Sequence, residues 1–226
     1  MAKKKFVILT QNTTMKYILT SSFNLVADDC LRYLGKSSKG LKVAFIDTAA
    51  DMYNKTEEAW LQADRTALVN AGCEVTDYTL VDKDKITLQQ ELSAFDIFFV
   101  AGGNTFYLLE KAKKSGFVEL LKENAWKDKI YIGSSAGSVL LSHDIDAIKF
   151  LDDPKHASLE STQAVGLLNF VFFPHWGAGV KFQERYNKAF EYIYHNGIAV
   201  LTVTDHQYLL ADGDTFKLIT ADDQTR

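Results

Sequence analysis

Short apolar segments alternate along this chain with longer amphipathic ones, and this alternation limits the possible folds more than any other feature of the sequence. Asp96–Ala101 (DIFFVA) is almost entirely apolar, which is typical of a strand buried on both faces. Similar short segments predict strands at Phe6–Leu9, Lys42–Asp47, Glu74–Leu80 and Lys129–Gly133. The amphipathic stretches predict helices at Ser22–Leu34, Thr56–Ala71, Leu88–Ala94, Thr105–Lys114 and Phe117–Trp126. This order predicts an α/β fold, a three-layer, doubly wound and mostly parallel sheet with helices on both faces.

The last third of the chain has a different pattern. It predicts a loop and strand at Val165–Pro174, a helix at Lys181–His195 and another strand at Ile198–Thr204. Two further strands, Gln207–Ala211 and Thr215–Ile219, flank Asp212-Gly213-Asp214, which is a hairpin-turn signal. An antiparallel C-terminal edge on the sheet is therefore expected. Because no repeat or linker interrupts the chain, residues 1–226 are expected to form a single domain.

Composition narrows the class of protein. The chain is 47% hydrophobic and 24% charged, which excludes a disordered, collagen-like or coiled-coil chain. Its 25 basic and 29 acidic side chains leave a net charge of −4, so no nucleic-acid partner is expected. No apolar run approaches the roughly 20 residues that span a membrane, and Phe6–Leu9 is too short for a signal-peptide core. We therefore expect a cytoplasmic protein without a membrane segment.

The segment Gly133-Ser134-Ser135-Ala136-Gly137 carries the strongest functional signal. It has the form Gly-x-Ser-x-Gly and lies between a predicted strand and a helical pattern, as a nucleophile elbow requires. In such a tight turn only small residues fit on either side of the serine, whose hydroxyl is raised toward the sheet edge. Ser135 is then the nucleophile, and the N–H of Ala136 faces developing negative charge. The alternative is a structural turn in which the serine only caps a helix.

A second glycine-rich segment, Ala101-Gly102-Gly103-Asn104-Thr105, directly follows the apolar strand. Backbone without side chains lets a ligand approach closely, so Gly102 and Asn104 are candidate substrate-binding residues. The N–H of Gly103 is a candidate second oxyanion donor beside that of Ala136. A phosphate cradle is a weaker interpretation, because the pattern is not Gly-x-Gly-x-x-Gly. The remaining alternative is a helix start capped by Asn104 or Thr105.

A serine hydroxyl needs a base to accept its proton, and five histidines are available. His175 is the first candidate because it follows an apolar strand, and His206 is the second. Trp176, next to His175, is a candidate wall of the substrate pocket.

A carboxylate should orient the base. Asp205, Asp152 and Asp153 are all acceptable by chain order, and the sequence does not choose among them. No metal site or other cofactor is predicted, because neither the stretch with His143, Asp144, Asp146 and His156 nor the two cysteines has a known ligand spacing.

Three motifs in this order resemble one family. Ala101–Phe106 (AGGNTF), Tyr131–Gly137 (YIGSSAG) and Pro174-His175 are similar to those of the serine peptidase family of peptidase E (α-aspartyl dipeptidase) and cyanophycinase. The resemblance implies a fold like that of class I glutamine amidotransferases. It also implies a nucleophile at Ser135, a base at His175 and oxyanion donors at Gly103 and Ala136. For the third member it implies Asp205, with Asp152 or Asp153 after the elbow as the alternative.

The sequence also departs from that family. Ser134 replaces the tryptophan that usually precedes the serine in peptidase E, and the segment after His175 is shorter than the dipeptidase's substrate loop. We expect a serine peptidase that hydrolyses short peptides, with Asp-Xaa dipeptides as candidate substrates, through an acyl-enzyme on Ser135. A monomer or homodimer without a cofactor is expected. The alternatives are another amide or ester hydrolase of the same fold, and a non-catalytic binding protein that has kept the fold.

Overall fold

A seven-stranded sheet with the order β3-β2-β4-β5-β1-β8-β9 forms the centre of the computed structural model, which describes residues 15–34, 37–212 and 215–221. Five of its strands are parallel: β1 (Lys16–Thr20), β2 (Lys42–Ile46), β3 (Glu74–Tyr78), β4 (Ile97–Val100) and β5 (Ile130–Ser134). The hairpin of β8 (Gln207–Asp212) and β9 (Thr215–Thr220) continues the sheet in antiparallel fashion beside β1. The mostly parallel sheet and its antiparallel C-terminal edge are therefore confirmed.

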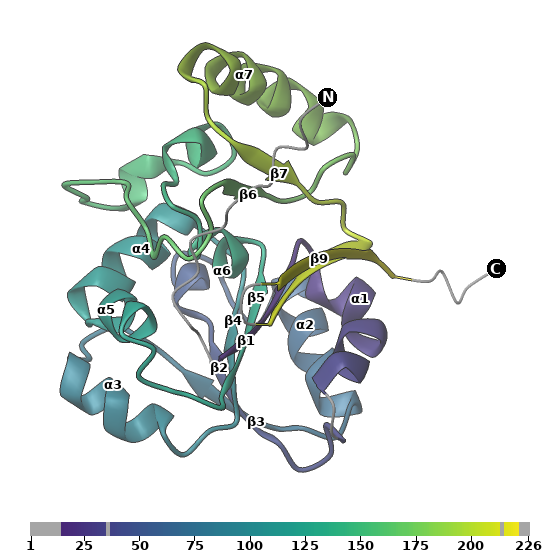
Figure 1. Ribbon diagram of the computed structural model, residues 1–226, viewed down its shortest axis with the longest axis vertical. Helices are drawn as coiled ribbons and strands as arrows, with labels where there is room; N and C mark the ends of the chain where they lie inside the picture. Colours follow the sequence, from purple (N-terminus) through teal and green to yellow (C-terminus); the bar gives the residue numbers. More distant parts are fainter. Residues whose placement is uncertain (1–14, 35–36, 213–214, 222–226) are drawn as a thin grey trace.

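Helices cover both faces of this sheet, as Figure 1 shows. Helices α1 (Phe23–Cys30) and α2 (Ala59–Asn70) lie on one face, and α3 (Lys85–Leu92), α4 (Thr105–Lys114) and α5 (Phe117–Lys122) lie on the other. Successive residues of β4 point to opposite faces, so that Phe99 packs on Phe23 of α1 while Phe98 packs on Trp126. The core is thus divided into two apolar clusters by the sheet, which confirms the three-layer prediction.

The first strand of the sheet is not predicted from the sequence. The predicted strand at Phe6–Leu9 lies outside the described residues, whereas β1 is formed by Lys16–Thr20. Only Tyr17, Ile18 and Leu19 of this strand are apolar, so it has little periodicity of its own. Its position between β5 and β8 supplies hydrogen bonds on both sides, and pairing with these neighbours rather than local propensity specifies it.

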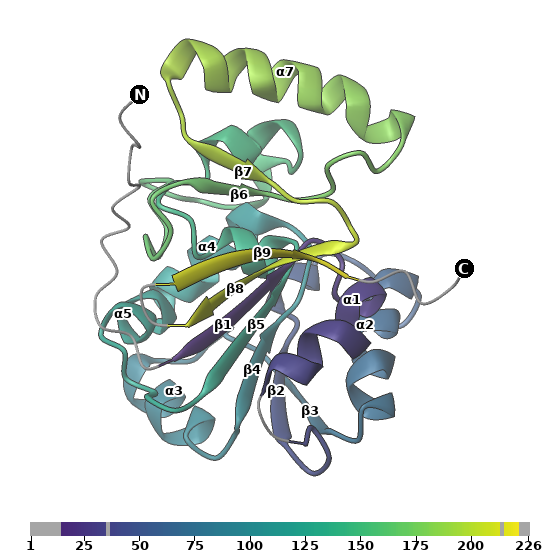
Figure 2. The same cartoon turned by 45° about the vertical axis from the view of Figure 1, so that its right-hand side comes forward.

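A separate two-stranded parallel sheet lies beyond the main one, as Figure 2 shows. It consists of β6 (Val171–Phe173) and β7 (Val200–Thr202), and α7 (Val180–Asn196) connects the two strands and covers them. Phe173 packs on Tyr186 and Phe190 of this helix. The strands and the helix are predicted from the sequence, but their separation from the main sheet is not, because three-residue strands carry no information about their partners.

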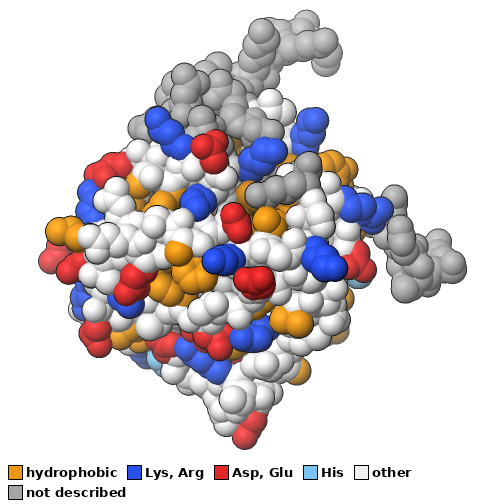
Figure 3. Space-filling view, turned by 90° about the horizontal axis from the view of Figure 1, so that it is seen from below, with side chains coloured by type: hydrophobic (Ala, Val, Ile, Leu, Met, Phe, Trp, Pro, Cys, Tyr) orange, Lys and Arg blue, Asp and Glu red, His pale blue; other side chains and the backbone are white. Residues whose placement is uncertain are grey.

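Charges of both signs are intermixed on the face in Figure 3, which views the molecule from below. Among the described residues, no helix is long and apolar enough to cross a membrane.

Candidate active site

Three neighbouring parallel strands, β4, β5 and β1, end at the same edge of the main sheet. The residues that follow them are Gly102 and Gly103 after β4, Ser135 after β5 and Ser21 after β1. The carboxyl edge of a parallel sheet is where α/β proteins bind their ligands, because several loops meet there. The topology therefore brings both glycine-rich motifs to one place.

Ser135 lies on a strained turn between β5 and the short helix α6 (Ala136–Val139). Its φ of 48° and ψ of −109° are unusual for a residue with a side chain. The flanking glycines are required by their surroundings. A Cβ at Gly137 would lie 1.9 Å from the carbonyl oxygen of Val100, and one at Gly133 would lie 2.6 Å from the nitrogen of Ser138. The Gly-x-Ser-x-Gly spacing thus follows from the backbone packing of this turn.

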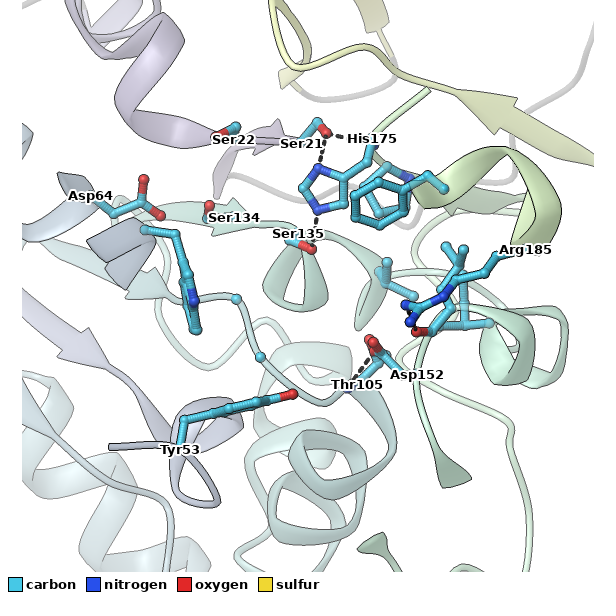
Figure 4. Close-up of a pocket in the computed structure, with 18 residues that line it drawn as sticks. Ser21, Ser22, Tyr53, Asp64, Thr105, Ser134, Ser135, Asp152, His175 and Arg185 are labelled. Carbon is cyan, nitrogen blue, oxygen red and sulfur yellow. Dashed lines mark hydrogen bonds between the residues drawn. The ribbon is translucent and has the colours of Figure 1, made fainter. Parts of the chain in front are cut away.

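Ser135, His175 and Asp205 form a continuous hydrogen-bonded series. The Oγ of Ser135 lies 3.0 Å from Nε2 of His175, as Figure 4 shows, and Nδ1 of His175 lies 2.8 Å from Oδ1 of Asp205. Burial raises the pKa of Asp205, but hydrogen bonds from His175 and Ser21 outweigh it and hold this pKa below its usual value. A hydroxyl, an imidazole and an ionised carboxylate in this order have the geometry of an activated nucleophile.

Asp152 and Asp153, the other two candidate acids, bind elsewhere. One carboxylate oxygen of Asp152 accepts hydrogen bonds from the backbone nitrogen of Thr105 at 2.9 Å and from its hydroxyl at 2.5 Å, at the start of α4. Asp153 accepts a hydrogen bond from the backbone nitrogen of Lys155. Among the three candidates, only Asp205 contacts the ring of His175 within the described residues.

Of the remaining residues expected at the site, Gly102 and Gly103 line a cavity in front of Ser135, whereas Asn104 and Trp176 do not. The cavity has a volume of about 430 Å³. Asn104 is buried, accepts a hydrogen bond from the nitrogen of Tyr107 and donates one to the carbonyl of Asp153, so its side chain caps α4. Trp176, expected at the pocket wall, instead packs on α7 against Tyr186 and Phe190 and is not among the residues that line the cavity.

The N–H groups of Gly103 and Ala136 are the two candidate oxyanion donors. Among the hydrogen bonds of the described residues, none engages the N–H of Gly103 or of Ala136. The backbone of Gly103 has a φ of 135°, and a Cβ there would lie 2.1 Å from the carbonyl oxygen of Ala49, so only glycine fits. Within the described part of the chain, neither N–H group is bound to a protein acceptor.

A sequence model of peptidase family S51 matches residues 15–219, which is most of the chain. This protein belongs to peptidase family S51. The membership identifies it as a serine-type peptidase and confirms the predicted resemblance to peptidase E.

Individual relatives of this S51 peptidase also carry peptidase names. An uncharacterized peptidase of Pasteurella multocida is 29% identical over 203 residues, which are 88% of this chain and 95% of the relative. An uncharacterized peptidase of Listeria innocua is 34% identical over 161 residues, 70% of this chain and 75% of the relative. The crystal structure of a protein provisionally described as a peptidase E from Listeria monocytogenes has a TM-score of 0.80 at 27% identity, and the match covers 91% of this chain and 98% of that one.

Several residues of the S51 peptidase's cavity are not predicted from the sequence. Ser21 contacts both His175 and Asp205. Aromatic walls are formed by Tyr53, Trp60 and Phe182, and the ionisable side chains of Asp64 and Arg185 also line the cavity. Asp152, which the sequence offers as an alternative third member, lines it as well. Figure 4 shows Asp64 and Ser134 on one side of Ser135, and Asp152 and Arg185 on the other.

Asp64 is a buried carboxyl group next to the elbow. Its Oδ1 accepts a hydrogen bond from the backbone nitrogen of Asn24 at 2.8 Å. Burial raises its pKa to about 6, although hydrogen bonds from Ser134 and Asn24 and the nearby His175 act in the opposite direction. One sequence signal could have found it, because Asp64 lies on the same buried helical stripe as Leu61 and Leu68.

The raised pKa of Asp64 predicts a pH-dependent stability. The pKa is about 6 in the folded protein against 3.8 for an ordinary aspartate, so the folded state binds this proton more tightly than the unfolded chain. Ionisation of Asp64 therefore lowers the free energy of unfolding as the pH rises from about 4 to about 6, and the loss persists at higher pH.

The variant Asp64→Asn should not show this loss, because the amide keeps an acceptor for the nitrogen of Asn24 but does not ionise. Its free energy of unfolding relative to wild type should increase by about 2 kcal/mol between roughly pH 4 and pH 7. Urea denaturation of both proteins across this range measures the difference. A difference that is the same at all pH values would contradict the prediction.

Proposed function

We propose that this S51 peptidase cleaves short peptides through an acyl-enzyme on Ser135, with His175 as the general base and Asp205 as the acid that orients it. The observation that supports the proposal is the series of contacts from the Ser135 hydroxyl through the His175 ring to the Asp205 carboxylate, at 3.0 and 2.8 Å. A cytoplasmic location and a single domain are also part of the proposal, and they rest on the sequence.

In the proposed reaction, Oγ of Ser135 attacks the scissile carbonyl carbon while its proton passes to Nε2 of His175. The tetrahedral oxyanion accepts hydrogen bonds from the N–H groups of Gly103 and Ala136. Loss of one such donor typically costs about 2.7–4 kcal/mol of transition-state stabilisation. The C–N bond then breaks, and the imidazolium returns its proton to the leaving amine. A water molecule, deprotonated by His175, hydrolyses the ester and releases the acid and free Ser135.

The cavity favours small substrates. Its volume of about 430 Å³ lies in the range of small-molecule sites, and a strand of a folded protein would not enter it. Arg185 supplies a cation that suits a substrate carboxylate, either the C-terminus of a short peptide or the side chain of an aspartate. Asp-Xaa dipeptides are therefore retained as candidate substrates beside other short peptides.

A dipeptide panel tests this proposal. The panel contains Asp-Xaa, isoaspartyl and uncharged N-terminal residues, each as the free peptide and as its C-terminal amide. We expect hydrolysis of free dipeptides, with lower kcat/KM for the amides because the carboxylate that Arg185 would bind is absent. Ser135→Ala is the control for contaminating peptidases. Absence of hydrolysis of every free dipeptide would contradict the proposed substrate class.

A further inference from the structure

We propose that Ser21 is a positioning residue that ties the His175–Asp205 pair to the sheet that carries Ser135. The inference rests on the proposed function, since it concerns the same three groups. It assigns a role to a residue that the peptidase motifs do not include.

The proposed catalytic groups come from two different sheets. Ser135 follows β5 of the main sheet, whereas His175 and Asp205 follow β6 and β7, which pair only with each other among the described strands. The two loops are joined by the hydrogen bond from the nitrogen of Trp176 to the carbonyl of Val203 at 3.0 Å. β8, which begins two residues after Asp205, pairs with β1 of the main sheet, but among the described strands no pairing joins the loop of His175 to that sheet. Other contacts must therefore fix His175 relative to Ser135.

Ser21 makes these contacts with a single hydroxyl group. The side chain is 1% exposed and follows β1, the neighbour of β5. Its Oγ accepts a hydrogen bond from the backbone N–H of His175 at 2.7 Å and donates its one proton to Oδ1 of Asp205 at 2.6 Å. The same Oγ lies 3.2 Å from Nδ1 of His175. The hydroxyl thus touches the backbone and ring of the base and the carboxylate that orients it.

On its other side, the end of β1 is bound to the elbow. The carbonyl of Thr20 accepts hydrogen bonds from the backbone nitrogen of Ser135 at 3.0 Å and from the hydroxyl of Ser138 at 2.8 Å. The hydroxyl of Thr20 donates to the carbonyl of Gly133 at 2.8 Å. Because Ser21 is the next residue, a short and rigid path runs from the nucleophile through Thr20 and Ser21 to the His175–Asp205 pair.

The backbone of His175 needs such support. Its φ of 60° is uncommon for a residue with a side chain, and such conformations persist only where the surroundings hold them. Without the Ser21 hydroxyl, the N–H of His175 loses its acceptor and Asp205 loses one of its donors. We therefore expect the ring to leave its position near Ser135, which lowers the rate of the chemical step more than it weakens substrate binding.

The variants Ser21→Thr and Ser21→Val test this inference as a matched pair, because they have the same shape and differ in the hydroxyl. The rate at which a fluorophosphonate labels Ser135 should fall roughly 10- to 100-fold in Ser21→Val, as expected for loss of a hydrogen bond to a charged group, and should largely recover in Ser21→Thr. With a peptide substrate the same loss should appear in kcat and much less in KM. Ser21→Ala, which adds no atoms, should behave as Ser21→Val and replaces it if the larger side chain prevents folding.

A second readout separates this inference from the proposed function. The low-field proton resonance of His175 Nδ1–H, bonded to Asp205, should be present in wild type and Ser21→Thr and broadened by exchange in Ser21→Val. Equal labelling rates and equal resonances in the folded Thr and Val variants would overturn the role of Ser21, while labelling of wild type would still support Ser135 as nucleophile. Failure of wild type to label would contradict the proposed function, and the resonances alone would then decide the role of Ser21.

Discussion

Replacement of Ser135 by alanine is expected to lower kcat for any hydrolysed peptide by roughly 10⁶-fold, the loss seen when a nucleophile of this kind is removed. The Oγ is the only atom of Ser135 that reaches Nε2 of His175, and alanine keeps the backbone of the elbow. We therefore expect an unchanged melting temperature together with loss of activity. Steady-state hydrolysis of the best dipeptide of the panel measures the effect.

Ser134→Ala is the matched control, since it removes the same atom from the neighbouring residue. The hydroxyl of Ser134 accepts a hydrogen bond from the nitrogen of Phe23 and supports Asp64, so it is engaged in structure. Its loss should cost stability but leave most of the activity. Loss of activity in Ser134→Ala with retention in Ser135→Ala would show that the nucleophile is Ser134 and not Ser135.

The second large effect is expected for Asp205→Asn, which should lower kcat by about 10⁴-fold. The lowered pKa of Asp205 means that it is ionised at neutral pH and accepts the Nδ1 proton of His175. An asparagine amide would instead donate to Nδ1, so the proton would move to Nε2 and the ring could no longer act as a base toward Ser135. The kcat of the purified variant, compared with wild type at neutral pH, measures this loss.

Asp152→Asn distinguishes the two acids that the sequence leaves open. The carboxylate of Asp152 is bound to Thr105 at the start of α4 and makes no hydrogen bond to the His175 ring within the described residues. We expect a loss of less than about 10-fold, the scale of one neutral hydrogen bond. A large loss in Asp152→Asn with little loss in Asp205→Asn would exchange the roles of the two residues.

The elbow could be predicted from the sequence because its requirements are local. A strand, a tight turn and a helix follow one another within a few residues, and glycine at positions 133 and 137 is imposed by atoms less than 3 Å away. The parallel sheet is predictable for a similar reason, since β4 is apolar throughout and is buried on both faces. Both features can therefore be recognised from residues that are close together in the sequence.

The rest of the site depends on contacts between distant segments. Asp205 and Asp152 both follow short apolar stretches, and the parallel pairing of β6 with β7 brings Asp205 to His175. The role of Ser21 has the same origin, because it lies 154 residues from His175 and 184 from Asp205 along the chain. Such pairings are decided by topology, which no local pattern of the sequence specifies.

The most direct test of the proposed mechanism is peptide mapping by mass spectrometry after reaction with a fluorophosphonate. We expect a single adduct on Ser135 in the wild-type protein and a strongly reduced adduct in His175→Ala, because the hydroxyl then has no base within reach. An elbow peptide that stays unmodified in the folded wild-type protein, or an adduct on Ser134 instead, would contradict the assignment of Ser135 as the nucleophile.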